Sequence, residues 1–266
     1  MLCQFTVKNY KSIRDEATFD MQAAAISEHE DRIIKDQDGE MYLPVSAIYG
    51  PNGGGKSNVL AALHTLVAKI LRPLYATEDN EDKVLLQKRI IVEPFAFSDS
   101  KNEPTKFELY FRTKSAEYRY ILHVKRDVVI YESLDRVKLE TGRRSALYTR
   151  DDKGIVLKGA FAKLKVSDDL SKTLTLLSYL GIAYKENVVV KDVLNWFEFG
   201  VDFLNYGNPI QELRMAISTS EDVKHLMLEM IQEMDLDIVD FRVEEKENDR
   251  IEAVSYTHLR AHETSA

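Results

Sequence analysis

Eight consecutive residues have the types and the spacing of a phosphate-binding loop. The string Gly50-Pro-Asn-Gly-Gly-Gly-Lys56-Ser57 fits the P-loop pattern G-x-x-x-x-G-K-[ST]. Its glycines allow backbone conformations that other residues avoid, and they let successive N–H groups approach phosphate oxygens closely. In this pattern the lysine reaches the β- and γ-phosphates and the Ser57 hydroxyl ligates Mg²⁺. The spacing therefore predicts a site for a nucleoside triphosphate with its magnesium ion.

The residues on both sides of the loop favour the same interpretation. Residues 44–49 are short, apolar and bounded by Pro and Gly, which predicts a buried strand. After the loop, apolar residues recur every three or four positions from Val59 to Leu71, which predicts a helix that ends at Pro73. A helix that begins near Gly55 directs its positive N-terminal end at the bound anion. A glycine-rich turn without a ligand is the weaker alternative.

The remaining pattern predicts a mixed α/β fold with α+β character. Residues 3–7 alternate as a half-buried strand that a strand at 17–21 can pair with. The period of two returns from 90 to 157, where Lys106 and Arg112 alternate with apolar residues such as Phe107, and this predicts an antiparallel meander. The helical period then predicts helices at 170–179, 188–199, 209–217 and 220–234, before a strand at 237–243.

The composition excludes several classes of protein. With 44% hydrophobic and 30% charged residues, the chain of 266 residues can form an ordinary globular core. The net charge of -8 argues against a uniformly basic surface for nucleic acid. The single cysteine, Cys3, excludes an internal disulfide. No apolar stretch is long enough to span a membrane and no secretory signal is present, so we expect a cytoplasmic protein.

Two strings resemble one group of P-loop ATPases. The loop with its next residue, Asn58, is similar to that of ATP-binding cassette ATPases of the RecF, structural-maintenance-of-chromosomes and OLD-nuclease type. The N-terminal string Phe5-Thr-Val-Lys-Asn-Tyr-Lys11-Ser12 matches their F-x-V-x-N-[FY]-[KR]-S strand. The resemblance implies that Lys11 and Ser12 lie near the nucleotide. The predicted site for ATP and Mg²⁺ is therefore Gly50, Pro51, Asn52, Gly53, Gly54, Gly55, Lys56, Ser57, Asn58, Lys11 and Ser12, with Ser57 on the metal.

Looser similarities extend to about residue 250. The Tyr118-Arg-Tyr120 and Asn195-Trp-Phe197 strings resemble bacterial AAA family ATPases of phage-defence and abortive-infection systems. The resemblance implies an N-terminal lobe over residues 1–253, with the P-loop at 50–57, an antiparallel subdomain at 90–157 and a helical arm at 167–234. Residues 254–266 break the preceding pattern and resemble a translated sequencing-library adapter, so we expect a non-native tail that is disordered or only loosely attached.

The residues that such an enzyme needs for hydrolysis are not found in the sequence. A strand that ends in Asp-Glu should hold Mg²⁺ and polarise the attacking water. Three segments resemble such a strand, and they end at Glu132, Asp192 and Asp240. Asp240 is the closest match, and we interpret all three residues as structural. We expect the lobe to be truncated before this Walker B half, and the fragment to bind ATP weakly without turnover.

Two functions remain open at this stage. The first is ATP binding by an ATPase head that, in the intact protein, dimerises around ATP and couples hydrolysis to a nucleic-acid or phage-defence transaction, with a nuclease or toxin as partner. The alternative is an ATP-sensing interaction module that does not hydrolyse ATP. A small-molecule kinase is a weaker possibility, because only Arg143 and Arg144 could form its lid. Zinc at His258 and His262, and base stacking on Trp196, are both less favoured than structural roles.

Overall fold

The computed structural model describes residues 1–24, 30–76, 90–97, 99–167, 169–203, 224–226, 228–229, 238–246 and 250–257. They belong to two compact units, Met1–Asp202 and Phe203–Ala266. The predicted loop at 77–89, the helix at 209–217 and the histidines 258 and 262 lie outside the described residues. None of the described helices is long and apolar enough to cross a membrane.

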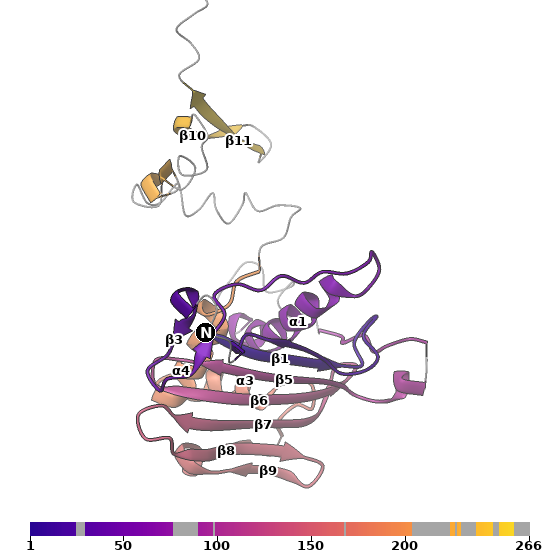
Figure 1. Cartoon of the computed structure of the whole chain (residues 1–266). Helices are drawn as coiled ribbons and strands as arrows, with labels where there is room; N and C mark the ends of the chain where they lie inside the picture. Colours follow the sequence, from indigo (N-terminus) through magenta and orange to yellow (C-terminus); the bar gives the residue numbers. More distant parts are fainter. Residues whose placement is uncertain are drawn as a thin grey trace, which may run out of the picture. The chain divides into compact units, whose positions relative to one another are not determined.

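A seven-stranded sheet forms the centre of the first unit (Figure 1). Its order is β2-β1-β5-β6-β7-β8-β9, and every neighbouring pair is antiparallel. The bounds of the strands are β1 Leu2–Lys8, β2 Ala17–Asp20, β5 Thr105–Arg112, β6 Ala116–Lys125, β7 Val128–Lys138, β8 Arg144–Asp151 and β9 Gly154–Leu157. The predicted meander at 90–157 is confirmed as β5 to β9 from residue 105 onward, whereas the described residues from 90 to 104 form no strand. The predicted N-terminal pair continues the same sheet.

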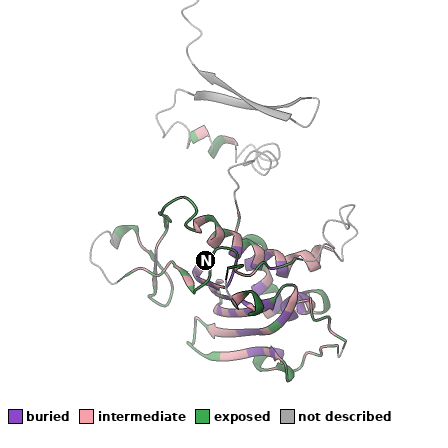
Figure 2. Ribbon diagram, turned by 90° about the vertical axis from the view of Figure 1, so that its right-hand side faces the viewer, coloured by how far each residue is buried: buried purple, intermediate pink, exposed green. Residues whose placement is uncertain are grey.

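Three helices pack on one face of this sheet: α1 (Lys56–Tyr75), α3 (Leu176–Ala183) and α4 (Val188–Phe199). The alternating residues of β1 and β5 that face them, such as Phe5 and Leu109, are buried (Figure 2). Trp196 of α4 stacks on Phe111 with their ring centroids 4.4 Å apart. The prediction that Trp196 belongs to the core is therefore confirmed.

The helix boundaries follow local capping. The sequence predicts α4 correctly, because the Asn187 side chain accepts hydrogen bonds from Val189 and Val190 at its first turn. The helix predicted at 170–179 begins only at Leu176, since Thr175 caps it. Pro73 lies inside α1, which ends two residues later at Tyr75.

One sequence prediction about this unit is wrong, and one buried charge was not predicted. Residues 44–49 form no strand, because none of the described strands pairs with them, and Val45 and Tyr49 are 77% and 89% exposed. Arg112 alternates with the helix-facing Phe111, as the sequence predicts, and yet it is only 6% exposed. Its guanidinium donates to Asp36 at 2.9 Å, to Asp38 at 2.7 Å and to Glu117 at 2.7 Å. These ion pairs bury it beneath the chain around β3 (Ile34–Lys35) and β4 (Met41–Tyr42).

The second unit contains an antiparallel pair, β10 (Ile238–Lys246) and β11 (Arg250–Thr257). The predicted strand at 237–243 is confirmed as part of β10. Residues 254–257 belong to β11 and pair with β10, so the expected disorder is wrong for these four residues. Within the predicted helix at 220–234, the described residues 224–226 and 228–229 are helical.

Candidate nucleotide-binding site

The P-loop connects the extended residues 44–49 to the first turn of α1. Gly53 and Gly55 have positive φ angles of 80° and 84°, which bulky residues avoid. Gly50, Pro51, Asn52, Gly53 and Gly54 are all exposed. The exposed glycine-rich backbone and the start of a 20-residue helix thus meet at Lys56.

Lys56 curls back over the loop. Its ammonium group donates hydrogen bonds to the carbonyl oxygens of Gly50 and Pro51, both at 2.8 Å. Ser57 follows in the first helical turn with an exposed side chain. A cation, a hydroxyl and the positive end of α1 therefore gather at one point, which is the combination that binds phosphate with a divalent metal.

The turn after β1 lies against this point. The Asn58 side chain donates to Ser12 Oγ at 2.6 Å. A Cβ atom on Gly55 would lie 3.0 Å from the same Ser12 oxygen, so loop and turn are in close contact. Lys11 is exposed, with its ammonium 5.5 Å from the centroid of the Tyr10 ring. The structure thus brings Ser12 to the P-loop and Lys11 to the same turn, and their contact with nucleotide stays a prediction.

Asn9 and Tyr10 were not among the predicted site residues, although both belong to this turn. Asn9 is buried with φ 58°, and its side chain donates to Ser100 and Glu103 carbonyls at 2.7 and 3.0 Å. Its Oδ1 accepts a hydrogen bond from the Phe95 N–H at 3.0 Å. A buried asparagine in a left-handed conformation is typical of a turn held by its side chain. The asparagine in the Asn9-Tyr10 string is the sequence signal of such a turn. The hydrogen-bond partners of Asn9 lie about ninety positions away in the chain, so the sequence alone did not indicate them.

The three carboxylates that imitate a catalytic strand end occupy other places. Glu132 is fully buried and accepts hydrogen bonds from the N–H groups of Leu176 and Leu177 at the start of α3. Asp192 of α4 accepts the Tyr118 hydroxyl at 2.8 Å, together with two further hydroxyls. These bonds agree with a structural role for both. Asp240 lies in β10, in the second unit.

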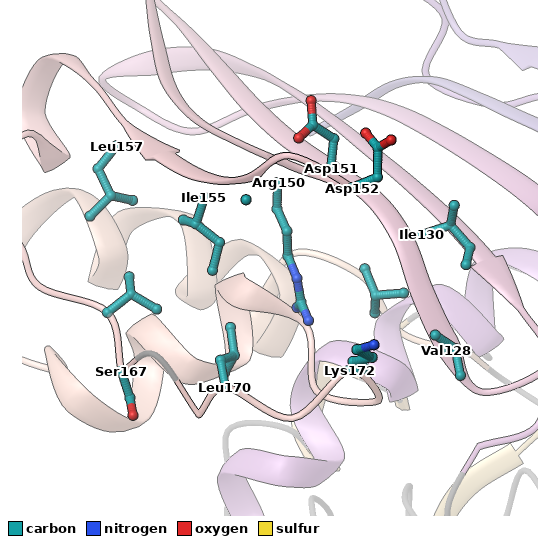
Figure 3. Close-up of a pocket in the computed structure, with 13 residues that line it drawn as sticks. Val128, Ile130, Arg150, Asp151, Asp152, Ile155, Leu157, Ser167, Leu170 and Lys172 are labelled. Carbon is teal, nitrogen blue, oxygen red and sulfur yellow. The ribbon is translucent and has the colours of Figure 1, made fainter.

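Figure 3 shows a cavity of about 690 Å³ at the β9 edge of the sheet, lined by β7 to β9 and by residues 166–172. Arg150 points into it, whereas the carboxylates of Asp151 and Asp152 point away. The Arg150 guanidinium already donates to the Leu174 and Ser171 carbonyls at 2.6 and 3.1 Å. It also lies 3.9 Å from Glu132. Because these groups engage the charge and donors of Arg150, we assign the cavity no part in phosphate binding.

A P-loop at the start of a helix packed on a sheet defines a nucleotide-binding protein of the P-loop class. A family model described as "AAA domain, putative AbiEii toxin, Type IV TA system" matches residues 45–197, more than half of the chain. The chain therefore belongs to this AAA domain family, whose members in general bind and hydrolyse ATP. Its match contains the P-loop, the meander and helices α1, α3 and α4. A comparison with curated proteins found no match.

Proposed function

We propose that this chain binds Mg²⁺–ATP at residues 50–58, with Lys11 and Ser12 beside the nucleotide. The observation that carries the proposal is the position of Lys56, which is held against two carbonyl groups of its own loop. An anion that enters the loop can recruit this ammonium group by a short side-chain rotation. The charge-assisted hydrogen bonds that it forms there are the strong kind.

Each remaining residue has a defined task in this proposal. Magnesium, when bound, neutralises phosphate charge, and the exposed Ser57 hydroxyl supplies one of its ligands. The N–H groups of Gly55, Lys56 and Ser57 face the phosphate oxygens in this proposal, because the first turn of a helix leaves its N–H groups without helical acceptors. Asn58 holds Ser12 at the edge of the loop. Lys11 adds a second cation beside the nucleotide, because its exposed ammonium group lies on the same turn as Ser12, over the Tyr10 ring.

We further propose that the protein acts as a cytoplasmic ATPase head that dimerises around ATP. Its hydrolysis would drive a nucleic-acid or phage-defence transaction, with a nuclease or toxin as partner. The description of the matched family, which names a toxin of a toxin–antitoxin system, supports this context. The resemblance to RecF-type and OLD-type ATPases supports the dimer.

An ATP-sensing module without hydrolysis is the second candidate. The engagement of Glu132 and Asp192 in structural hydrogen bonds favours it, because neither carboxylate is free to polarise water. In this case ATP would hold a protein interface closed by binding alone.

The test uses the whole chain and its Lys56→Ala variant, with Lys153→Ala as the matched control on the exposed turn between β8 and β9. Titration with Mg²⁺–ATP should give an affinity that K56A lowers about tenfold to a hundredfold, as expected for losing a hydrogen bond from a charged group. K153A should bind like the parent chain. Equal affinities for K56A and the parent would overturn the assignment of the P-loop as the ATP site. Phosphate release above background, lost in K56A, would favour the ATPase over the sensor.

A further inference from the structure

Tyr10 connects the turn after β1 to helix α1. Its side chain is 2% exposed, and the ring packs edge-on against Phe107 with centroids 6.1 Å apart. The hydroxyl passes beyond this packed ring and reaches the helix. It lies 2.8 Å from Thr65 Oγ1 and 3.2 Å from the Ala61 carbonyl oxygen.

The three groups form a closed hydrogen-bond network. Thr65 Oγ1 donates to the Ala61 carbonyl at 2.8 Å, so the Tyr10 hydroxyl completes a triangle on the surface of α1. Partly buried hydroxyl networks of this kind fix orientation, because a group that loses its partner is only incompletely solvated in exchange. The ring fixes the position of Tyr10 in the core beneath the sheet, and the hydroxyl fixes the position of α1 relative to Tyr10.

Ser12 makes a second contact to the same helix, through Asn58. The contacted residues 58, 61 and 65 are spaced by three and four positions, so they share one face of α1. Asn9 fixes the base of the turn to residues 95–104. The turn after β1 therefore contacts α1 along residues 58–65, close to the N-terminus that carries Lys56 and Ser57.

We infer that the Tyr10 hydroxyl is a positioning group for the nucleotide site. This inference rests on the proposed ATP-binding function and deepens it. Tyr10 sets where α1 begins relative to Ser12, and thereby the spacing between the loop amides, Ser57 and the turn that carries Lys11. Small displacements of positioned groups are costly for a site that depends on several aligned donors.

The test removes the hydroxyl and keeps the ring. Tyr10→Phe leaves the contact with Phe107, and Thr65→Val removes the partner hydroxyl at nearly constant shape. Tyr118→Phe is the matched control, because this buried tyrosine donates to Asp192 of α4 rather than to α1. The affinity for Mg²⁺–ATP and the amide hydrogen exchange of residues 56–65 without nucleotide are measured for each variant of the whole chain.

We expect Y10F to weaken ATP binding about three- to tenfold, the size of one net hydrogen bond. It should also speed exchange at residues 56–65 in the absence of nucleotide. T65V should act in the same direction, and the double variant should lose less than the product of the two single effects. Y118F should leave both affinity and exchange at these residues unchanged, even where it lowers the melting temperature.

The outcomes separate the two proposals. If the parent chain binds no nucleotide, the proposed function fails, while the exchange data still decide whether Tyr10 holds the start of α1. If the parent binds and Y10F matches it in affinity and exchange, the positioning inference is overturned and the ATP site stands. Equal losses in Y10F and Y118F would show a general loss of stability and would also overturn the inference.

Discussion

Glu132 shows how one residue can resemble a catalytic group in sequence and hold the fold together in structure. Its carboxylate is fully buried and accepts hydroxyl hydrogen bonds from Tyr120 at 3.0 Å and Tyr148 at 2.8 Å. Two N–H groups at the start of α3 donate to it as well. Burial raises the pKa of the Glu132 carboxyl, and the backbone N–H groups of α3 oppose that rise. The residue joins two strands to a helix terminus, which leaves no oxygen for chemistry.

Glu132→Ala should therefore be among the costly single substitutions in this chain. It leaves two tyrosine hydroxyls and two backbone N–H groups without their acceptor, and it removes the carboxylate that lies 3.9 Å from Arg150. The free energy of unfolding should therefore fall by about 3–5 kcal/mol. Glu132→Gln keeps the shape but turns one acceptor into a donor, so we expect a loss of about 1–3 kcal/mol. Urea denaturation measures both, with Glu140→Gln on the exposed turn between β7 and β8 as control. An E132A chain within 1 kcal/mol of the parent would contradict the role given to this network.

At the scale of elements, the sequence predicted best those helices and strands whose formation depends on local sequence signals. The alternation in β5 and β6 and the Asn187 cap of α4 are local signals, and all three elements formed as predicted. Residues 44–49 carry an apolar strand pattern, but a strand also needs a neighbour that supplies hydrogen bonds, and no described strand does so. The burial of Arg112 was not predicted for a related reason, because its three carboxylate partners are distant in the sequence or unmarked by any motif.

The candidate site divides in the same way. The P-loop could be read from spacing alone, since its function depends on consecutive backbone groups. The contact of Ser12 with Asn58 joins residues 46 positions apart. Only a resemblance to known strings indicated it. Tyr10 was missed because its hydroxyl is useful only once β1 and α1 are packed together.

The packing of loop against turn makes a prediction about two glycines. Gly53 and Gly55 share a left-handed conformation, so Ala at either position should cost about 1–2 kcal/mol of strain. Nothing lies within 4 Å of a Cβ at Gly53, whereas a Cβ at Gly55 meets Ser12 Oγ at 3.0 Å. Gly55→Ala should therefore lower the melting temperature and the affinity for Mg²⁺–ATP more than Gly53→Ala does. If G53A proves equally harmful, the contact between loop and turn has no influence on the site.

At the scale of the whole molecule, the site belongs to one of two compact units. The unit Met1–Asp202 contains the complete seven-stranded sheet, helices α1, α3 and α4, and the P-loop. Among the residues that the structure describes, the contacts of Lys56, Asn58 and Tyr10 that hold the loop lie within this unit. The unit Phe203–Ala266 contributes the pair β10–β11 and has its own internal contacts. Folding and nucleotide binding should therefore be separable from the second unit.

A chain of residues 1–202 tests this directly. It keeps the core between sheet and helices, so we expect a single cooperative thermal transition within about 4 °C of the full chain, which corresponds to about 1 kcal/mol at this size. It should also keep the affinity for Mg²⁺–ATP, because Lys56, Ser57 and the turn after β1 remain. Calorimetry and nucleotide titration measure both, and a chain of residues 1–253 serves as the intermediate control. A non-cooperative or aggregated 1–202 chain, beside a well-behaved 1–253 chain, would show that residues 203–253 complete the fold. Normal folding of 1–202 with lost binding would instead place a nucleotide contact in the second unit.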